Sequence, residues 1–275
     1  MKSVLASAMV MVVGLAACRV SVETQTRYTR EGGDVNATAS AAYAPGDKVS
    51  VTLLGVEASG IGVSFNGGVI VNAADTDKVS VTARVIGYGY SEDEADATTA
   101  IGAVAQGIAV VKEGGTWVVT CSKQKQGDAS AGCELLTVTV PRGTTAAPLD
   151  VRVDSQLGTI NANFRNDVVA NLDVKANGAS PEIVAQADPA VGGRIRLVSD
   201  EGAVRLDLAP TVSVDSVQLT GRTEAEAASG EEFSDSSFPG ATFDGTSFRI
   251  GTAGAGAASV VLSGGSVRLK NPGDN

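Results

Sequence analysis

The sequence contains no histidine in 275 residues. This absence excludes Ser-His-Asp and Cys-His nucleophile activation, imidazole metal sites and the commonest general base. The Ca²⁺-loop pattern Asp-x-Asp-x-Asp-Gly is missing as well. We therefore predict a protein without catalytic residues, without a metal site and without a cofactor.

Aromatic and basic residues are scarce. Aromatic side chains make up 4% of the chain and Trp117 is the single tryptophan, so stacking platforms for carbohydrate are few. The chain has 21 Lys and Arg residues against 31 Asp and Glu residues, a net charge of −10. This balance argues against nucleic acid as a partner, because neutralisation of phosphates by Lys and Arg dominates that affinity. It also argues against an electrostatic hold on anionic lipid.

The apolar run that opens the chain is too short to cross a membrane. Residues 4–13 form a run of about ten residues, whereas a spanning helix needs about 20. Lys2 supplies a positive charge before the run, and small residues follow it. This combination predicts a secretory signal peptide covering residues 1–17.

Four residues at the end of this segment indicate an anchor. Leu15-Ala16-Ala17-Cys18 resembles the lipobox of bacterial lipoproteins, in which the cysteine thiol is diacylated before the signal peptide is removed. The resemblance implies lipidation of Cys18, with palmitate-type acyl chains as the contact with the membrane. Because Arg19 and not an aspartate follows the cysteine, the resemblance also implies sorting to the outer membrane. The alternative is an ordinary signal peptide with a chance cysteine.

Two cysteines remain for the exported domain. In an oxidising compartment Cys121 and Cys133 are expected to form a disulfide that closes the base of a loop. Closing a loop of about a dozen residues stabilises a fold by about 3 kcal/mol in the chain-entropy model. The alternatives are two free buried thiols, or half of a metal site.

The remaining chain is divided by its patterning. Residues 18–47 are polar and rich in Thr, Ser, Gly and Ala, which predicts a poorly ordered spacer after the lipidated cysteine. Residues 48–270 alternate apolar and polar side chains between glycine turns, as expected for strands with one buried face. Residues 271–275 are expected to form a frayed tail.

One helix is predicted within this β-rich domain. Ser91-Glu92-Asp93-Glu94 has the capping-box spacing, with Ser91 as N-cap and Glu94 reaching back to its amide. Apolar residues follow at helical spacing until Gly107. The acidic first turn complements the helix dipole, so we favour a solvated helix start over a cation site.

A short phrase recurs in the second half of the chain. Residues 193–197, 202–206 and 265–269 each contain a turn glycine, an inward apolar residue, an outward arginine and an inward leucine. Such recurring units predict rungs that cover one another's apolar faces. The predicted fold is all-β, a parallel β-helix or solenoid-like stack of short strands with one short helix, and a β-sandwich is the alternative. The arginines either recruit a polyanion or, as we favour, keep exposed strands soluble.

An acidic stretch interrupts the strands near the C-terminus. Residues 224–237 are rich in Glu, Gly, Ser and Ala and are predicted to form a long surface loop. Phe238, Phe243 and Phe248 follow at regular spacing and are interpreted as core anchors of a final strand pair.

The strand pattern as a whole resembles a known family. Repeating Gly-x-Val/Ile strands, the segment Val138 to Thr144 (VTVPRGT) and a terminal glycine-turn strand are similar to the bacterial "putative adhesin" domain, also called the head GIN domain. The resemblance covers residues 48–270. It implies an all-β fold of parallel, β-helix-like coils, exported and often lipid-anchored, without established catalytic residues. The predicted helix and cysteine loop depart from that pattern.

Three functions are consistent with these features. The first is a non-catalytic binding or adhesion module of the cell envelope, with a protein or glycan ligand at the cell surface. The second is a structural or envelope-maintenance lipoprotein that contacts partners through strand edges. The third is a glycan hydrolase using the pairs Asp200 and Glu201, or Glu231 and Glu232. Adjacent residues on a strand face opposite sides, which counts against both pairs.

Overall fold

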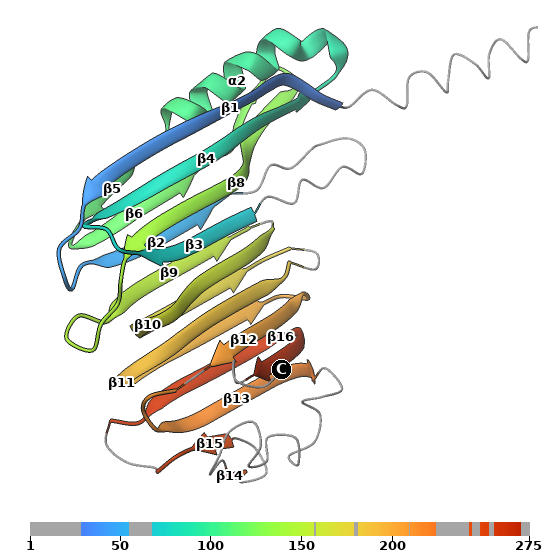
Figure 1. Cartoon of the computed structure of the whole chain (residues 1–275). Coiled ribbons are helices and arrows are strands. Elements are labelled where there is room, and N and C mark those ends of the chain that lie inside the picture. The colour runs from blue at the N-terminus through green and yellow to red at the C-terminus, as the bar shows by residue number, and fades with distance from the viewer. Residues whose placement is uncertain are drawn as a thin grey trace, which may run out of the picture.

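The computed structural model describes residues 29–54, 68–156, 158–178, 181–208, 210–223, 242–243, 248–252 and 256–270. The lipobox with Cys18, the stretch at 224–237, Phe238 and the tail at 271–275 lie outside these ranges. The described chain consists mainly of strands (Figure 1). The prediction of an all-β fold is confirmed.

Two hydrogen-bonded stacks of strands run along the molecule. The first has the order β1 (Thr29–Ala42), β4 (Lys78–Gly89), β8 (Ala129–Pro141), β3 (Gly68–Ala74), β10 (Thr159–Ala176), β11 (Ile183–Ser199), β12 (Ala203–Leu208) and β16 (Ala258–Lys270). The second has the order β5 (Val110–Glu113), β6 (Thr116–Cys121), β2 (Lys48–Leu53), β9 (Leu149–Ser155), β10, β11, β16, β13 (Val214–Thr223), β15 (Phe248–Ile250) and β14 (Thr242–Phe243).

Parallel pairing dominates both stacks. Neighbouring strands are parallel from β8 to β16 in the first stack and from β6 to β13 in the second. Antiparallel pairs are confined to the ends, where β1, β4 and β8 lie at one end and β13, β15 and β14 at the other. The solenoid-like prediction therefore describes this arrangement better than the β-sandwich alternative does.

Long strands join the two stacks around one core. The first part of β10, from Ile160, pairs with β3, and its second part, from Val169, pairs with β9. The register shifts between Asn163 and Val168, where the strand bends from one stack to the other. Buried side chains alternate along both stacks, and nearly all of them belong to one large cluster. Alternation with one face buried is the pattern that the sequence predicted.

The coil length can be read from the register. Val151, Leu172 and Ile195 are successive partners in the second stack, so one coil takes 21 to 23 residues. The recurring phrases fit this scheme, because residues 203–207 pair in register with 266–270. The phrase at 193–197 lies in the other stack, beside β16. The predicted rungs are thus real, with two strands per coil.

The last strand does not lie last in the stack. β16 is inserted between β11 and β13, with Val260 pairing with both Ile195 and Val217. Its second half also pairs with β12. Nothing in the sequence pattern indicated this inserted position.

The helix closes the first end of the core. A 3-10 turn, η1 (Ser91–Asp93), leads into α2 (Glu94–Gln106), which lies over β1 in Figure 1. Ala97, Ala100, Ile101 and Val104 are its buried residues. Close approach to β4 depends on Gly87, because a Cβ there would lie 3.0 Å from the Cδ1 of Ile101. Solenoids need such caps, since a terminal rung otherwise exposes its apolar face.

The predicted capping box is displaced by one residue. Asp93, not Glu94, supplies the capping carboxylate, whose Oδ2 accepts a hydrogen bond from the amide of Tyr90 at 3.0 Å. The reason is that Ser91 already lies inside the 3-10 turn, so Tyr90 takes the N-cap position. The helix ends at Gln106, with Gly107 as its C-cap, as predicted.

Two predicted loops are strands. β1 covers Thr29–Ala42, inside the range 18–47 that was expected to be a poorly ordered spacer, and pairs with β4 along its length. Its small and polar residues have modest β propensity, but pairing and burial against a neighbour override propensity. The predicted loop after Cys121 likewise contains β7 (Gln124–Gln126), which pairs with the start of β8.

Candidate functional site

A disulfide joins the two stacks across the core. The structure contains the Cys121–Cys133 bond, with the two Cα atoms 6.3 Å apart and both side chains buried. Cys121 ends β6 in the second stack, whereas Cys133 lies in β8 in the first. The predicted disulfide is therefore present, and besides closing the loop between the two cysteines it connects strands that are not paired with each other.

The outward arginines are matched by acids. Arg196 lies 3.0 Å from Asp173 on the neighbouring strand, and Arg205 lies 2.8 Å from Glu182. Exposed ion pairs of this kind contribute little stability, but they cancel charge locally. The arginines are therefore poorly suited to recruiting a polyanion, and the solubility interpretation is favoured.

A pocket of about 420 Å³ opens beside the bends of the long strands. It lies where β10 and β11 pass from the first stack to the second, next to the end of β12. Its polar lining comes from three successive coils: Arg165, Asn166, Gln186, Asp188, Asp207 and Thr211. A guanidinium, two carboxylates and two carboxamides thus meet in one concave site.

The bend in β10 is held from beneath by a buried carboxylate. Asp167 is 1% exposed and accepts hydrogen bonds from Arg142 and from the amide of Gly143, each at 3.0 Å. The residue before it, Asn166, has φ of 65°, a left-handed conformation in which asparagine is more tolerated than most residues. The bend therefore presents Arg165 and Asn166 to the pocket on a fixed backbone.

The two carboxylates of the pocket have different surroundings. Asp188 is partly buried and accepts a hydrogen bond from the amide of Thr211 at 2.9 Å. Burial raises the pKa of Asp188 above its usual range, because desolvation disfavours the charged form. Asp207 accepts a hydrogen bond from the carboxamide of Gln186 at 3.0 Å. The site can therefore donate and accept hydrogen bonds to a polar ligand in defined directions.

Sequence reasoning missed this pocket. The alternation between residues 48 and 270 predicts strands but singles out none of the residues that line the pocket, and the polar triplet Arg165-Asn166-Asp167 was not considered. That triplet, in the middle of one long strand, was the available signal, because polar residues at strand bends can aim side chains at a ligand. The partners from β11 and β12 come together only through the coil register.

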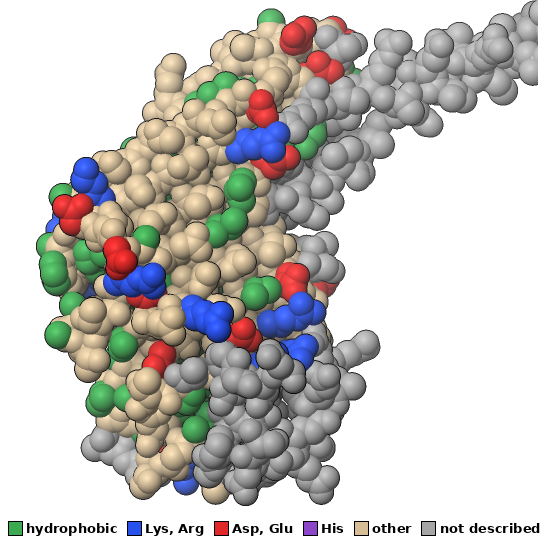
Figure 2. All heavy atoms as spheres, viewed as in Figure 1, with side chains coloured by type: hydrophobic (Ala, Val, Ile, Leu, Met, Phe, Trp, Pro, Cys, Tyr) green, Lys and Arg blue, Asp and Glu red, His purple; other side chains and the backbone are tan. Residues whose placement is uncertain are grey.

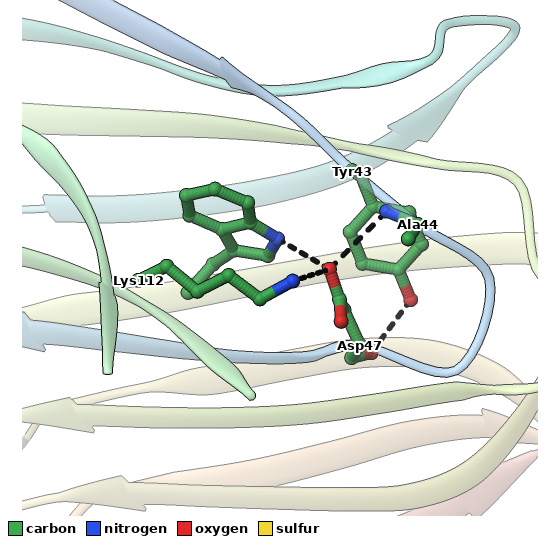
Figure 3. Close-up of polar contacts among 5 residues, drawn as sticks. Tyr43, Ala44, Asp47 and Lys112 are labelled. Atoms are coloured by element: carbon green, nitrogen blue, oxygen red, sulfur yellow. Dashed lines mark hydrogen bonds and ion pairs between the residues drawn. The ribbon is translucent and has the colours of Figure 1, made fainter. Parts of the chain in front are cut away.

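A second polar cluster has a structural role (Figure 3). The Oδ2 atom of Asp47 accepts hydrogen bonds from Lys112 Nζ at 2.7 Å, Trp117 Nε1 at 2.8 Å and the amide of Ala44 at 3.2 Å. The Tyr43 hydroxyl donates to the backbone oxygen of Asp47 at 2.7 Å. The Lys112 hydrogen bond lowers the pKa of Asp47. The cluster fastens the β1–β2 turn to the edge of the second stack and leaves Asp47 little capacity for a ligand.

The carboxylate pairs suggested by the sequence do not form this site. Asp200 and Glu201 are exposed in the turn before β12, away from the pocket lining. Glu231 and Glu232 lie outside the described residues. Within the described ranges no cluster of three or more Cys, Asp or Glu residues is arranged to hold a metal ion. Nor does any helix of those ranges have the length and apolarity needed to cross a membrane.

Comparison with known proteins gives a likeness of fold. No protein-family model and no curated protein matches the sequence. A solved structure from Clostridium sporogenes, a "putative cell adhesion protein", superposes with a TM-score of 0.53 at 9% identity and covers 87% of this chain and 100% of its own. A "putative adhesin" from Bacteroides fragilis gives 0.24 at 10% identity, covering 87% and 99%. The first likeness shows that the solenoid-like fold is shared.

Proposed function

We propose that this protein is a non-catalytic binding module of the adhesion type, and that the pocket at Arg165 and Asp188 is its ligand site. The observation that carries the proposal is the meeting of both charge signs and two carboxamides in one concave site on three packed coils. Ligand sites typically combine concavity with a few placed polar groups. The backbone beneath is fixed by the buried Asp167, so little ordering is needed on binding.

The anchor and location belong to the same proposal. Lipidation of Cys18 would hold the domain at the outer membrane of the bacterial envelope, and the lipobox resemblance at Leu15, Ala16 and Ala17 supports this. Two or more acyl chains give stable attachment, which one chain does not. The structural neighbour described as a cell adhesion protein is consistent with a role at the cell surface.

The ligand site is tested with whole cells that express the full chain. Adhesion is measured on immobilised fibronectin, collagen and a panel of oligosaccharides. We expect adhesion to at least one surface, and its loss in Arg165→Ala and Asp188→Asn. Arg152→Ala is the matched control, because Arg152 is an exposed arginine on β9, outside the pocket. Equal adhesion by all variants, or none by the wild type, would contradict the proposal.

The anchor is tested separately. Metabolic labelling with a palmitate analogue is expected to mark the wild-type chain and not Cys18→Ala. Protease treatment of intact and lysed cells then reports the location. Digestion on intact cells supports adhesion. Digestion only after lysis would favour the envelope-maintenance alternative, in which β1, the terminal strand of the first stack, offers its second edge to a partner.

A second candidate function has one specific observation in its favour. Asp188 and Asp207 share the pocket, and the pKa of Asp188 is raised. Glycosidases use two carboxyl groups held in unlike environments. We would conclude that the protein is a hydrolase if the wild type releases reducing sugar from a polysaccharide and both Asp188→Asn and Asp207→Asn lose this activity. Adhesion without release of sugar would support the non-catalytic module.

A further inference from the structure

The outer face of the first stack carries two rows of uncharged polar side chains. Each row crosses six strands, β1, β4, β8, β3, β10 and β11, and its members are register partners. One row consists of Thr38, Thr82, Thr137, Ile70, Asn161 and Val184. The other consists of Ser40, Ser80, Thr139, Asn72, Asn163 and Gln186. We call these twelve side chains the polar face.

Alternation along the strands turns this face outward. Of the residues between the two rows, Ala39 on β1 is partly buried, and the others are buried in the core: Val81, Val138, Val71, Ala162 and Ala185. Within a row, residues on neighbouring strands are about 4.8 Å apart, and the two rows are about 6.6 Å apart along each strand. Ten of the twelve side chains are Ser, Thr, Asn or Gln. The face is therefore a regular grid of hydroxyl and amide groups.

Charge is confined to the margins of this grid. Arg84 pairs there with Asp34 at 2.8 Å and with Glu134 at 3.1 Å, and Arg142 lies 3.5 Å from Asp75. Figure 2 shows the face as a broad tan area with red and blue side chains gathered mostly around it. A protein with 52 charged residues (21 basic and 31 acidic) thus keeps a wide surface uncharged.

The chemistry of the grid selects among partner classes. It holds no cation, so it cannot neutralise the phosphates of nucleic acid or of anionic lipid. It holds two aliphatic side chains, Ile70 and Val184, and no aromatic one, whereas protein interfaces have an apolar, aromatic-rich core. What remains is a partner that is itself uncharged and carries hydroxyl groups at short, regular intervals.

We infer that the polar face binds a neutral polysaccharide laid across the strands. Of its polar side chains, Asn163 and Gln186 hydrogen bond to Arg165 and Asp207, and the others make no side-chain hydrogen bond to the described part of the chain. They therefore exchange water for sugar hydroxyls at little cost. Each contact is weak, and affinity comes from many contacts along one polymer. Gln186 also lines the pocket, so one chain can reach from the face into the pocket. The inference rests on the proposed adhesion function and names its ligand class.

The test is retention of the mature full chain, in detergent, on insoluble neutral polysaccharide. The probes are microcrystalline cellulose, chitin and starch granules, with heparin-agarose as the charged comparison. We expect retention on at least one neutral polymer and not on heparin. A lysine in the middle of the face, Thr137→Lys, is expected to weaken retention by about tenfold or more, because the sugar must desolvate the new charge. Asn72→Lys is expected to act alike.

The matched control is Thr52→Lys on β2, which places the same charge on the outer face of the second stack, next to Asp154. Equal melting temperatures of the variants would show that folding is intact. Wild-type retention that survives in Thr52→Lys and is lost in Thr137→Lys supports the inference. No retention on any neutral polymer, or equal loss in both lysine variants, overturns it. Loss in Asp188→Asn alone also overturns it, while leaving the pocket as the adhesion site.

Discussion

Asp47 shows how one carboxylate can fix a chain reversal. Its Oδ2 collects three donors that come from the turn itself, from β5 and from β6. We expect Asp47→Asn to lower the free energy of unfolding at pH 7, because the charge-assisted bond from Lys112 is weakened. The pKa of Asp47 is lowered on folding, so its contribution is present above the ordinary value of 3.8 and is lost as the pH falls through the folded-state pKa.

The measurement is urea unfolding of wild type and Asp47→Asn at pH 7 and at pH 3. The difference in stability is expected to shrink at the lower pH. A difference that is constant over this range would show that the charge of Asp47 is not what stabilises the turn.

Asp188 is expected to behave in the opposite way. Its pKa is raised on folding, so the ionised carboxylate opposes folding at pH values above the folded-state pKa, and this penalty disappears below 3.8. Asp188→Asn keeps an oxygen for the amide of Thr211 and removes the charge. The variant should be more stable than wild type at pH 7 and equal to it in acid, by thermal unfolding. Stabilisation together with lost adhesion would mark Asp188 as a residue kept for binding.

At the level of single residues, part of the site could be predicted from the sequence. The outward placement of Arg196 and Arg205 followed from alternation alone, since a strand has a period of two. The cysteine pair followed from the exported context. The pocket did not, because Arg165, Asp188 and Asp207 are separated by about a coil each and meet only through register. Alternation shows which side a residue faces, and leaves its neighbour on the next coil undetermined.

At the scale of the elements, β6 and β8 are joined by the Cys121–Cys133 disulfide. No ladder of hydrogen bonds joins β6 to β8. Loss of the Cys121–Cys133 bond therefore leaves only side-chain packing to hold these two strands together. We expect the Cys121→Ala, Cys133→Ala double variant to lose about 2–5 kcal/mol of unfolding free energy. The measurement is guanidinium unfolding, with reduced wild type as a comparison. An unchanged midpoint would show that the core alone sets the stability of this end.

The elements were predicted best where alternation is strong. β2 and β4 show the predicted alternation most clearly, because valines alternate with polar residues in both. β1 was missed because alanine, asparagine and glycine fill much of it and give no clear period. Its pairing with β4 and the cover of α2 decide its structure, and neither can be read from the segment itself.

For the whole molecule, the position of β16 makes a sharp prediction. Deleting residues 258–275 removes the strand that lies between β11 and β13 and also borders β12. We expect the truncated chain to lose amide protection in β11 to β13 while β4 and β8 stay protected, because each coil is stabilised mainly by its neighbours. Hydrogen exchange with mass spectrometry reports this. Uniform protection in the truncated chain would show that β11 and β13 can close on each other without β16.

The same insertion separates the order of synthesis from the order of assembly. A solenoid built only of consecutive coils can add each rung as it emerges, since all its contacts are local. Here β13 has a parallel partner only once residues 258–267 are available, so these coils are completed by a strand that is made well after β13 itself. Until β16 has been made, β11 and β13 lack the strand that pairs with both of them, and the nascent chain is prone to misassembly. Synthesis that stops before β16 thus leaves a gap inside the stack, between β11 and β13, and not merely a shorter stack.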